Sequence, residues 1–231
     1  MPVALITGAS RGLGRALARS LADRGWRLVL DARDAGDLAA VEQELGDRTE
    51  VVAISGDVTD ETHRKSLLDG VAGGRLDLLV NNASLLGPSP QPNLADYDLD
   101  TLVGVYAVNV FAPVRLIQLA LPLLRASAGH VINVTSDAAV EGYAGWGGYG
   151  SSKAALEQAS RVLAAEEPAV RVWWFDPGDM NTRMHQEAFP DEDISDRPLP
   201  ETVVPALLML VDRDPPSGRY RAADLLEVVA S

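Results

Sequence analysis

A glycine-rich segment directly after the first apolar stretch restricts the fold more than any other feature of the sequence. Residues 3–6 are apolar, and the segment TGASRGLG follows at positions 7–14. Glycines in such a loop let the backbone turn tightly and approach a pyrophosphate, and the amides of the following helix can bind phosphate oxygens. The spacing departs from G-x-G-x-x-G and is compatible with an ordinary strand–helix turn, but its position between strand and helix favours a nucleotide site.

Short apolar segments alternate with longer amphipathic segments along most of the 231 residues. This alternation is typical of a parallel sheet covered by helices on both faces. The sequence therefore predicts one domain over residues 1–231, with an α/β fold built on a single Rossmann-type doubly wound parallel sheet. The predicted strands are residues 3–6, 27–30, 51–55, 76–80, 131–134 and 170–175, with an edge strand at 219–220. The predicted helices are residues 15–24, 35–45, 61–71, 97–110, 114–127, 151–165 and 203–211.

Two segments depart from this regular alternation. Pro113 lies between the predicted helices 97–110 and 114–127, and proline favours a helix break or a first-turn position. Residues 183–198 are polar, charged and contain proline, with weak periodicity. Such a segment is typical of an irregular loop over a site, so it is predicted to be a substrate lid.

The charge and the cysteine content exclude several classes of function. The net charge is −13, which argues against binding to nucleic acids or to anionic membranes, because both require a basic surface. The chain contains no cysteine, and this excludes disulfides, thiolate catalysis and thiolate metal sites.

The histidines and the N-terminal residues add two further expectations. His63 is predicted on a helix surface, His130 at the start of a strand and His185 in the lid, where it could touch substrate; their spacing does not match a metal site. The N-terminal residues lack the features of a secretory signal, and no apolar run approaches the roughly 20 residues of a membrane span. A cytoplasmic protein without a metal is therefore expected.

Three polar residues in the second half of the chain could carry chemistry. Tyr149 and Lys153 are four residues apart at the start of a predicted helix, so their side chains share one face. A lysine ammonium beside a phenol lowers the phenol pKa, and such a tyrosine can donate or accept the proton that accompanies hydride transfer. Ser136 follows a predicted strand and could reach the same pocket. A surface pair and a turn serine are the alternatives.

Taken in order, these motifs resemble those of the short-chain dehydrogenase/reductase family. The matching features are TGASRGLG at 7–14, Asp57, NNAS at 81–84, Asn109, Ser136 and YGSSK at 149–153. The resemblance extends from Thr7 to about Thr182, and the ordered set is far more specific than any single motif. It implies an oxidoreductase with a nicotinamide cofactor, a carbonyl or alcohol substrate, and a homodimer or homotetramer. NNAS replaces the commoner glycine ending, so Ser84 adds a side chain beside the cofactor.

The resemblance also implies a role for each matching residue. Tyr149 is expected to be the general acid/base, and Ser136 to orient the reacting oxygen. Lys153 is expected to bind the nicotinamide ribose and lower the tyrosine pKa, and Asn109 to hold a water that links Lys153 to solvent. The expected cofactor-binding residues are Gly8, Ser10, Arg11, Gly12, Leu13, Gly14, Arg33, Asp57, Val58, Asn82, Ala83, Lys153, Pro177, Gly178 and Thr182.

The end of the second predicted strand, LDARD at residues 30–34, bears on the choice between NAD and NADP. An acid at this strand end binds the ribose 2′-hydroxyl of NAD, whereas arginine accommodates the 2′-phosphate of NADP. In the family, NAD users usually carry the acid where Ala32 stands, and Arg33 and Arg11 match the bases of NADP users. The sequence therefore favours NADP, and Asp31 is the observation in favour of NAD.

Three alternative functions remain open. They are an NAD-dependent dehydrogenase of the same fold, a non-catalytic dinucleotide-sensing protein, and an epimerase or dehydratase that reuses the tyrosine–lysine pair. The intact pair argues against the sensor, and the short C-terminal region leaves little room for the nucleotide-sugar domain of the third class. Tyr143 and Trp146 are expected to line the substrate pocket, and Trp173 and Trp174 to pack inside the fold.

Overall fold

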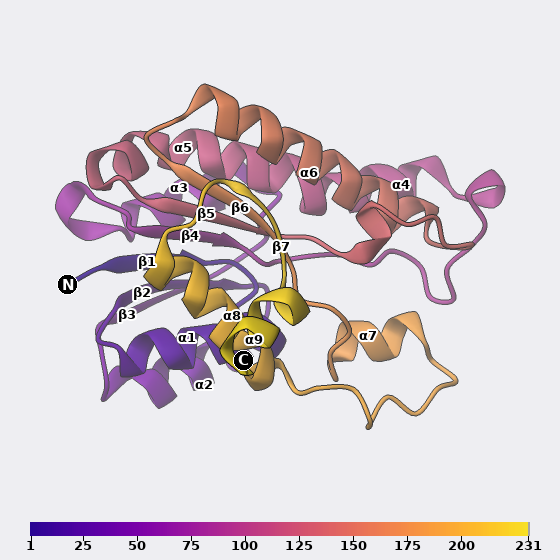
Figure 1. The fold of residues 1–231 in the computed structure, drawn as a ribbon, viewed down its shortest axis with the longest axis horizontal. Coiled ribbons are helices and arrows are strands. Elements are labelled where there is room, and N and C mark those ends of the chain that lie inside the picture. Colours follow the sequence, from indigo (N-terminus) through magenta and orange to yellow (C-terminus); the bar gives the residue numbers. More distant parts are fainter. Residues whose placement is uncertain (231) are drawn as a thin grey trace.

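Within residues 1–230, which the computed structural model describes, seven parallel strands form one sheet in the order β3-β2-β1-β4-β5-β6-β7 (Figure 1). The strands are β1 (Val3–Ile6), β2 (Arg27–Ala32), β3 (Val51–Ser55), β4 (Leu78–Asn81), β5 (His130–Val134), β6 (Arg171–Asp176) and β7 (Gly218–Arg221). The order reverses direction between β1 and β4, and ligands bind at the carboxyl ends of the strands at such a point. The predicted Rossmann-type fold is confirmed.

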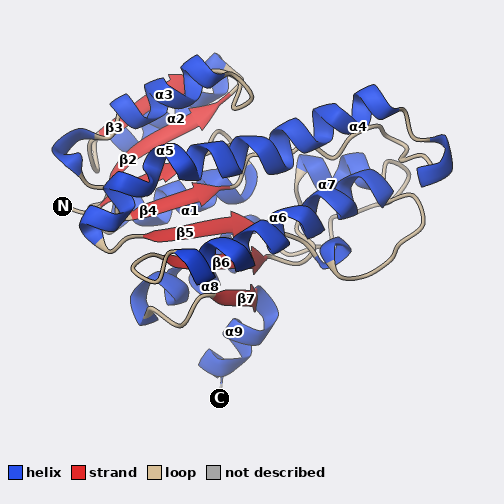
Figure 2. Cartoon of the chain, turned by 90° about the horizontal axis from the view of Figure 1, so that it is seen from above, coloured by secondary structure: helices blue, strands red, loops and turns tan. Residues whose placement is uncertain are grey.

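Helices cover both faces of this sheet (Figures 1 and 2). They are α1 (Gly12–Asp23), α2 (Ala35–Gly46), α3 (Glu61–Asp69), α4 (Leu99–Tyr106), α5 (Ala112–Ser127), α6 (Gly147–Glu166), α7 (Arg183–Ala188), α8 (Pro200–Arg213) and α9 (Ala222–Ala230). Short turns are η1 (Ala72–Gly74), η2 (Leu94–Asp96), η4 (Asp137–Ala139) and the π-helical η3 (Ala107–Phe111). Side chains of α1, α2 and α8 form one core layer with the sheet, and those of α3, α5 and α6 contribute to the other.

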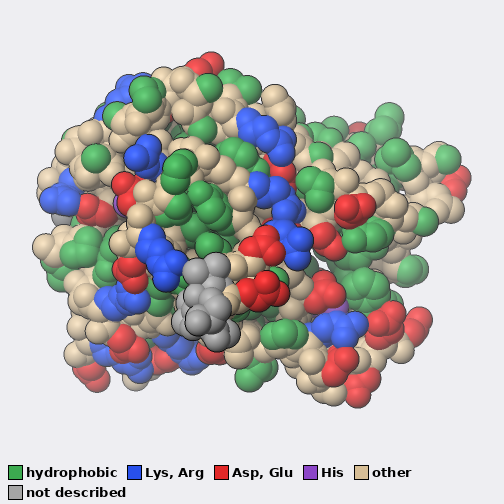
Figure 3. Space-filling view, in the orientation of Figure 1, with side chains coloured by type: hydrophobic (Ala, Val, Ile, Leu, Met, Phe, Trp, Pro, Cys, Tyr) green, Lys and Arg blue, Asp and Glu red, His purple; other side chains and the backbone are tan. Residues whose placement is uncertain are grey.

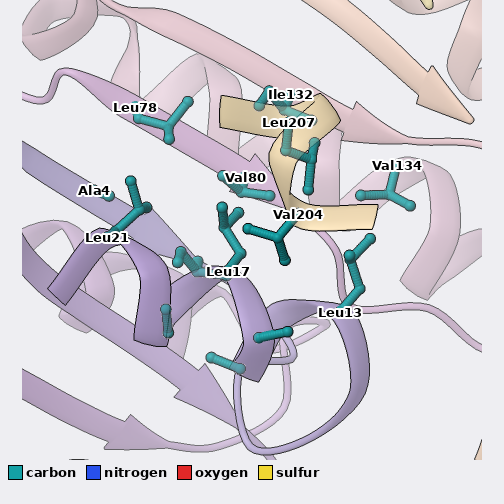
Figure 4. Close-up of a cluster of buried hydrophobic side chains, with 14 of the residues drawn as sticks. Ala4, Leu13, Leu17, Leu21, Leu78, Val80, Ile132, Val134, Val204 and Leu207 are labelled. Atoms are coloured by element: carbon teal, nitrogen blue, oxygen red, sulfur yellow. The ribbon is translucent and has the colours of Figure 1, made fainter. Parts of the chain in front are cut away.

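One of these core layers holds the glycine-rich loop in place. Leu17 and Leu21 are one helical turn apart on α1 and lie in the same buried cluster as Val204 and Leu207 of α8 and Ala4 of β1 (Figure 4). Burying a leucine side chain of this kind contributes roughly 1.5–3 kcal/mol to stability. Because α1 starts directly after the glycine loop, this packing fixes the loop against the carboxyl end of β1.

The helical region around Pro113 differs from the predicted pair of separate helices. The chain runs continuously from α4 through the π turn η3 into α5, with Pro113 in the first turn of α5. Proline cannot donate a hydrogen bond to the carbonyl of Asn109, four residues earlier. A π turn accommodates the missing donor without ending the helix, and such turns are frequent at functional positions.

The continuous stretch Leu99–Ser127 is also long and apolar enough to meet a length and hydropathy criterion for a membrane span, since an 18-residue part of it has a mean hydropathy of 1.6. The expectation that no apolar run approaches that length was therefore wrong. Length and composition do not distinguish a span from the core helix of a globular protein. Here Leu116, Ala120 and Leu124 are at most 1% exposed and pack in the core layer against the sheet, which is the arrangement of a core helix.

The C-terminal third contains two helices that the sequence did not predict. Residues 183–198, predicted as an irregular lid, contain the short helix α7, and the remainder of the segment is loop and turn. The predicted edge strand is β7, which pairs in parallel with β6 at the end of the sheet. The helix α9 follows β7 directly.

Candidate active site

A cleft of about 960 Å³ opens at the carboxyl ends of the strands. It brings together most of the residues that the sequence analysis selected: Gly8, Ser10, Arg11, Gly12, Leu13, Arg33, Asp57, Val58, Asn82, Ala83, Ser136, Tyr149, Lys153, Pro177, Gly178 and Thr182. Gly14 and Asn109 do not line the cleft but contact residues that do.

The glycine loop lies closely against the segment that follows β4. Gly8 has a φ of +65°, in the left-handed region that favours glycine, and a Cβ there would lie 2.9 Å from the Cα of Ala83. A Cβ on Gly14 would collide with the carbonyl oxygen of Gly8. The side-chain amide of Asn82 donates hydrogen bonds to the carbonyls of Thr7 and Gly8, at 2.9 and 3.0 Å. The result is a narrow backbone cradle at the start of α1, where free amides can bind phosphate.

The tyrosine–lysine pair is buried in the wall of the cleft. α6 begins at Gly147, so Tyr149 lies in its first turn and Lys153 one turn later. Their exposed fractions are 8% and 2%. The Lys153 Nζ lies 5.5 Å from the centroid of the Tyr149 ring and donates a hydrogen bond of 2.8 Å to the carbonyl of Val134, at the end of β5. Helix and strand end together hold the two side chains in one place.

Burial dominates the protonation of this pair. It raises the pKa of the Tyr149 phenol well above its ordinary value, and it lowers the pKa of Lys153 to about 7. The sequence analysis predicted that the ammonium would lower the tyrosine pKa, but in the protein chain by itself desolvation is the larger effect. At neutral pH the phenol is therefore protonated, and Lys153 releases its proton far more readily than a lysine in water.

Asn109 is a buried clamp in the π turn. Its Nδ2 donates to the carbonyl of Leu85 and to the Ser152 Oγ, both at 2.9 Å. Its Oδ1 accepts from the Leu85 amide at 2.8 Å and from the Ser84 Oγ at 3.1 Å. These four hydrogen bonds use the full capacity of a carboxamide. The side chain therefore ties the loop after β4 to α6 and has no position left for the expected water, and Ser84 takes part in the clamp.

Ser136 stands at the mouth of the cleft, directly after β5. Its Oγ donates to the Asp137 Oδ1 at 2.8 Å and accepts from the Ala138 amide at 3.2 Å. The Asp137 Oδ2 in turn accepts a hydrogen bond from the Tyr143 hydroxyl at 3.0 Å. Asp137, which the sequence analysis did not select, thus ties Ser136 to Tyr143, one of the predicted pocket residues.

A buried ionic network behind Ser136 was also missed by the sequence analysis. Arg219 of β7 donates to Glu157 Oε1 and Asp176 Oδ2, each at 2.9 Å, and to the backbone carbonyl of Ser136 at 3.2 Å. Glu157 is 1% exposed and also accepts from the Thr135 hydroxyl at 3.0 Å. The network connects α6, β6 and β7 to the backbone of Ser136. The one signal in the sequence is Glu157 itself, which follows Lys153 by four residues on the same helix face.

At the other end of the cleft, Asp31 and His63 form a buried pair. The His63 Nε2 lies 2.6 Å from the Asp31 Oδ1, and the two side chains are 8% and 2% exposed. The prediction that His63 lies on a helix surface was wrong: it precedes the buried Leu67 by four residues and shares its inward face. Arg11 and Arg33 are exposed and line the cleft nearby.

An aromatic cluster lies at the outer part of the cleft. Trp146 lines the cleft as predicted, but the prediction for Tyr143 was wrong, because its ring packs beside Trp146 and does not line the cleft. The Trp146 ring is 5.8 Å from both the Tyr149 and the Phe189 rings, measured between centroids, and 6.4 Å from that of Tyr143. His185 of α7 lines the cleft, and its ring is 4.9 Å from that of Phe189. Phe189 lies in the predicted lid segment and was not selected from the sequence.

The lid segment is acidic on its outer side. The lobe around α7, at the lower right of Figure 3, carries several acidic side chains. The exposed acidic residues of segment 183–198 are Glu187, Asp191, Glu192, Asp193 and Asp196. The lobe is tied to the loop after β4 by a hydrogen bond of 2.6 Å from the Ser89 hydroxyl to the Glu187 carbonyl.

Trp173, Trp174 and His130 pack inside the fold, as predicted for the two tryptophans. Trp173 is fully buried and donates a hydrogen bond of 3.1 Å to the Pro215 carbonyl, and His130, at the start of β5, stacks on its ring. In the part of the chain that the structure describes, no group of three or more histidine, cysteine, aspartate or glutamate side chains is arranged to hold a metal ion.

Known proteins of similar sequence are oxidoreductases. Residues 2–193 match the family model described as short chain dehydrogenase. The benzil reductase ((S)-benzoin forming) of Saccharomyces cerevisiae is 34% identical over 195 residues, which cover 80% of this chain and 74% of the yeast protein. The sepiapterin reductase of Mus musculus is 36% identical over 201 residues, covering 80% of this chain and 77% of the mouse protein.

Solved structures agree with this result. A short chain dehydrogenase from Shigella flexneri, complexed with NADP, superposes with a TM-score of 0.89 at 30% identity, over 96% of this chain and 97% of that one. The family model covers most of the chain, and the fold and the order of the motifs match. The protein therefore belongs to the short-chain dehydrogenase/reductase family and is an oxidoreductase of that family.

Proposed function

We propose that the protein transfers a hydride between NADP(H) and a carbonyl or alcohol, with Tyr149 as the general acid/base. The observation that carries the proposal is the buried contact between Tyr149 and Lys153, 5.5 Å from Nζ to ring centroid, in the wall of the cleft beside Ser136. A protonated phenol at this position can donate its proton to a carbonyl oxygen while hydride reaches the carbon, and the product is the alcohol.

The cleft has the features that a dinucleotide requires. The backbone at Gly8 and Gly14 is too close to its neighbours for any side chain, and it forms a cradle for a pyrophosphate at the start of α1. When bound, the nicotinamide supplies or accepts the hydride. Lys153 would bind the ribose next to it, and Pro177, Gly178 and Thr182 would hold the carboxamide; these positions follow from the family motif.

Each remaining residue of the catalytic set has a separate task. Ser136 orients the reacting oxygen, and its backbone is held by Arg219. Asn109 acts as a positioning residue, since its side chain is fully hydrogen-bonded to the loop after β4 and to α6. A proton relay to Lys153 would then use the Asn109 backbone carbonyl, which lacks its ordinary α-helical donor because of Pro113.

NADP is the proposed cofactor in preference to NAD. Arg11 and Arg33 are exposed at the adenosine end of the cleft, where a 2′-phosphate would lie, and arginine suits such a group because its fork of donors matches phosphate oxygens. Asp31, the residue in favour of NAD, is 1% exposed and already hydrogen-bonded. The relative from Shigella flexneri is complexed with NADP.

The proposed substrate is a ketone that carries a planar, apolar group. The aromatic side chains of Trp146 and His185 line the outer cleft, with Met184 and Leu86 beside them, and Tyr143 packs behind Trp146. Flat ring systems pack favourably on such side chains. The benzil reductase among the relatives is named for an aryl diketone, which belongs to this class.

The test is reduction of benzil by the purified protein, followed by the loss of NADPH absorbance, with NADH in parallel and Tyr149→Phe as the matched control. We expect turnover with NADPH, much less with NADH, and none with Y149F. Cofactor binding without turnover of benzil or of other aryl ketones would favour the dinucleotide-sensing alternative. Faster turnover with NADH would favour the NAD-dependent alternative.

Assembly and location are further predictions. A homodimer or homotetramer is proposed, because family members typically associate through the helices that correspond to α4, α5 and α6. This region exposes the apolar side chains of Leu99, Val103, Phe111 and Val162. Light scattering coupled to size-exclusion chromatography would measure the mass. The cytoplasmic location that the sequence predicts would be tested by fractionating cells that produce the protein.

A further inference from the structure

The buried Asp31–His63 pair has a place in the cleft that the proposed chemistry does not use. Asp31 is the last residue but one of β2, so its carboxylate emerges at the carboxyl end of the sheet beside the glycine loop. One oxygen lies 2.6 Å from the His63 Nε2, and the other accepts a hydrogen bond of 3.4 Å from the Gly8 amide. Both oxygens are therefore bonded within the protein, although Asp31 lines the cleft.

The fold provides a seat for the His63 ring. A Cβ on Gly56 would lie 2.7 Å from both Cγ and Cε1 of His63, so any side chain at position 56 would displace the ring. Gly56 does not have a positive φ, so other residue types could adopt its backbone conformation. The absence of a side chain at this position serves the histidine ring and not a turn.

The backbone of His63 is fixed as well. It lies in the first turn of α3, where the Asp60 carboxylate accepts hydrogen bonds from the amides of Thr62 and His63, at 2.6 and 3.2 Å. An N-cap of this kind sets the direction in which the first helical residues project. The seat, the cap and the hydrogen bond together direct His63 onto the Asp31 carboxylate.

The electrostatic consequence concerns the adenosine end of the cofactor. A free carboxylate at the end of this strand would accept a hydrogen bond from a ribose 2′-hydroxyl and repel a 2′-phosphate. His63 occupies one carboxylate oxygen and offers a counter-charge when protonated. The neighbouring Asp57 carboxylate is likewise engaged, by the amide and hydroxyl of Thr59 at 2.8 and 2.7 Å. Arg11 and Arg33 line this part of the cleft together with Asp34 and Asp37, and the two guanidinium groups supply the donors that match a phosphate.

We propose that His63 is a specificity-determining positioning residue, which withholds Asp31 from the ribose and so sets the preference for NADP over NAD. The inference rests on the proposed function, because it presumes a dinucleotide in this cleft. His63 acts through Asp31 and does not itself contact the cofactor.

The experiment measures dissociation constants for NADPH and NADH, by quenching of intrinsic tryptophan fluorescence, in the wild type, His63→Ala, Asp31→Asn and the double variant. We expect H63A to lower the preference for NADPH by about tenfold, which corresponds to about 1.4 kcal/mol, because the freed carboxylate repels the phosphate and binds the hydroxyl. D31N in the H63A background should restore the preference, since it removes that carboxylate charge.

Two further variants separate specificity from structure. Gly56→Ala leaves both members of the pair intact but fills the seat, and it should shift the preference in the same direction as H63A. His63→Gln keeps a hydrogen-bond donor and should shift it less. If His63 has only a structural role, H63A should weaken the binding of NADPH and NADH equally, and that outcome would overturn the inference. A double variant with the same cofactor preference as H63A would also overturn it.

The wild-type measurement tests the proposed function independently. A wild type that binds neither cofactor, or that binds NADH more tightly, overturns the proposed cofactor. A wild type that prefers NADPH, with the same preference in H63A and G56A, overturns only the role of His63. Thermal unfolding of each variant confirms that the comparison is made between folded proteins.

Discussion

The two ends of the cleft each contain a buried pair of titratable side chains, and the pairs differ in what surrounds them. At the adenosine end, Asp31 and His63 have opposite charge preferences and are in direct contact at 2.6 Å. At the catalytic end, Lys153 is buried against a backbone carbonyl and the ring of Tyr149. Burial raises the pKa of Asp31, raises that of Tyr149 and lowers that of Lys153 to about 7.

This difference separates positioning from chemistry. A contact between an acid and a base holds both side chains in place, so a bound ligand changes their charge little. A buried lysine beside a phenol lacks such compensation, so its charge responds to whatever enters the cleft. Burial opposes ionisation at both ends, but contact with His63 offsets part of that cost for Asp31, whereas Lys153 is bonded to a neutral carbonyl at the end where the proposed mechanism moves a proton.

The largest effect is expected for Tyr149→Phe. The change removes one hydroxyl from a buried ring, so the packing stays while the proton donor is lost, and reductase activity should fall by roughly 10²–10⁴-fold. Steady-state rates with NADPH and benzil measure the loss, and fluorescence titration checks that cofactor binding persists. Turnover equal to that of the wild type would show that another group supplies the proton. The Tyr149–Lys153 pair would then have no chemical role that distinguishes it from the Asp31–His63 pair.

Arg219→Ala should have the next largest effect. It leaves the buried carboxylates of Glu157 and Asp176 with one partner fewer, and breaking such a pair costs about 3 kcal/mol. Arg161→Ala is the matched control, because Arg161 bonds the same Glu157 at 3.0 Å but is 46% exposed, and it should cost less than about 1 kcal/mol. Urea unfolding measures both.

The Arg219 variant also bears on catalysis. Its guanidinium holds the backbone carbonyl of Ser136, so kcat should fall in R219A and stay near the wild-type value in R161A. Equal losses of stability in the two variants would mean that the network is no more than a surface ion pair. In that case, Arg219 would not be a rigid support for the backbone of Ser136.

Lys153→Met should stabilise the protein when no cofactor is present. The folded protein binds the lysine proton with a pKa of about 7, against about 10.4 in an unfolded chain. Between these values the unfolded chain holds a proton that the folded chain has released, so stability rises with pH, and the cost of burial is greatest below pH 7. We expect K153M to gain about 2 kcal/mol at pH 7, after the loss of one hydrogen bond.

The measurement is the free energy of unfolding from pH 6 to pH 9. The advantage of K153M should shrink as the pH rises, and Lys65→Met, which alters a side chain that is 59% exposed on α3, should change little at any pH. A K153M variant that is less stable than the wild type across the whole range would mean that burial of Lys153 carries no cost.

Local patterns predicted more of the fold than of the site. The strands, the glycine loop and the Tyr149–Lys153 face follow from apolar runs and helical spacing, which depend on near neighbours in the chain. Arg219 could not be found this way, because it reaches Ser136 across 83 positions of sequence. The inward orientation of His63 was within reach, since Leu67 shares its helix face and Gly56 precedes it, but a polar residue on a helix is ordinarily placed outside.

The region around Pro113 shows a different limit. The proline was correctly expected at a first helical turn or at a break, and the structure has the first of these, within a continuous helix. Whether a helix ends at a proline depends on what satisfies the carbonyl that the proline cannot serve. Here the chain passes through a π turn, and the Asn109 side chain fixes that turn to the loop after β4. Such tertiary contacts are not encoded in helical periodicity.

The smallest effect is expected for Phe189→Ala. Phe189 does not line the cleft, but its ring backs Trp146 at 5.8 Å and His185 at 4.9 Å. Aromatic contacts of this kind contribute about 0.5–1.5 kcal/mol, so KM for an aryl ketone should rise roughly three- to tenfold. Because the ring of Trp146 stands between Phe189 and Tyr149, kcat should hold its wild-type value. Phe111→Ala, at a ring that is 59% exposed and does not line the cleft, serves as the control in a preparation whose mass by light scattering matches the wild type, and it should leave both constants unchanged. A fall in kcat with unchanged KM in F189A would contradict this prediction. It would mean that Phe189 supports proton transfer, and the catalytic end of the cleft would then include the aromatic residues proposed here to bind substrate.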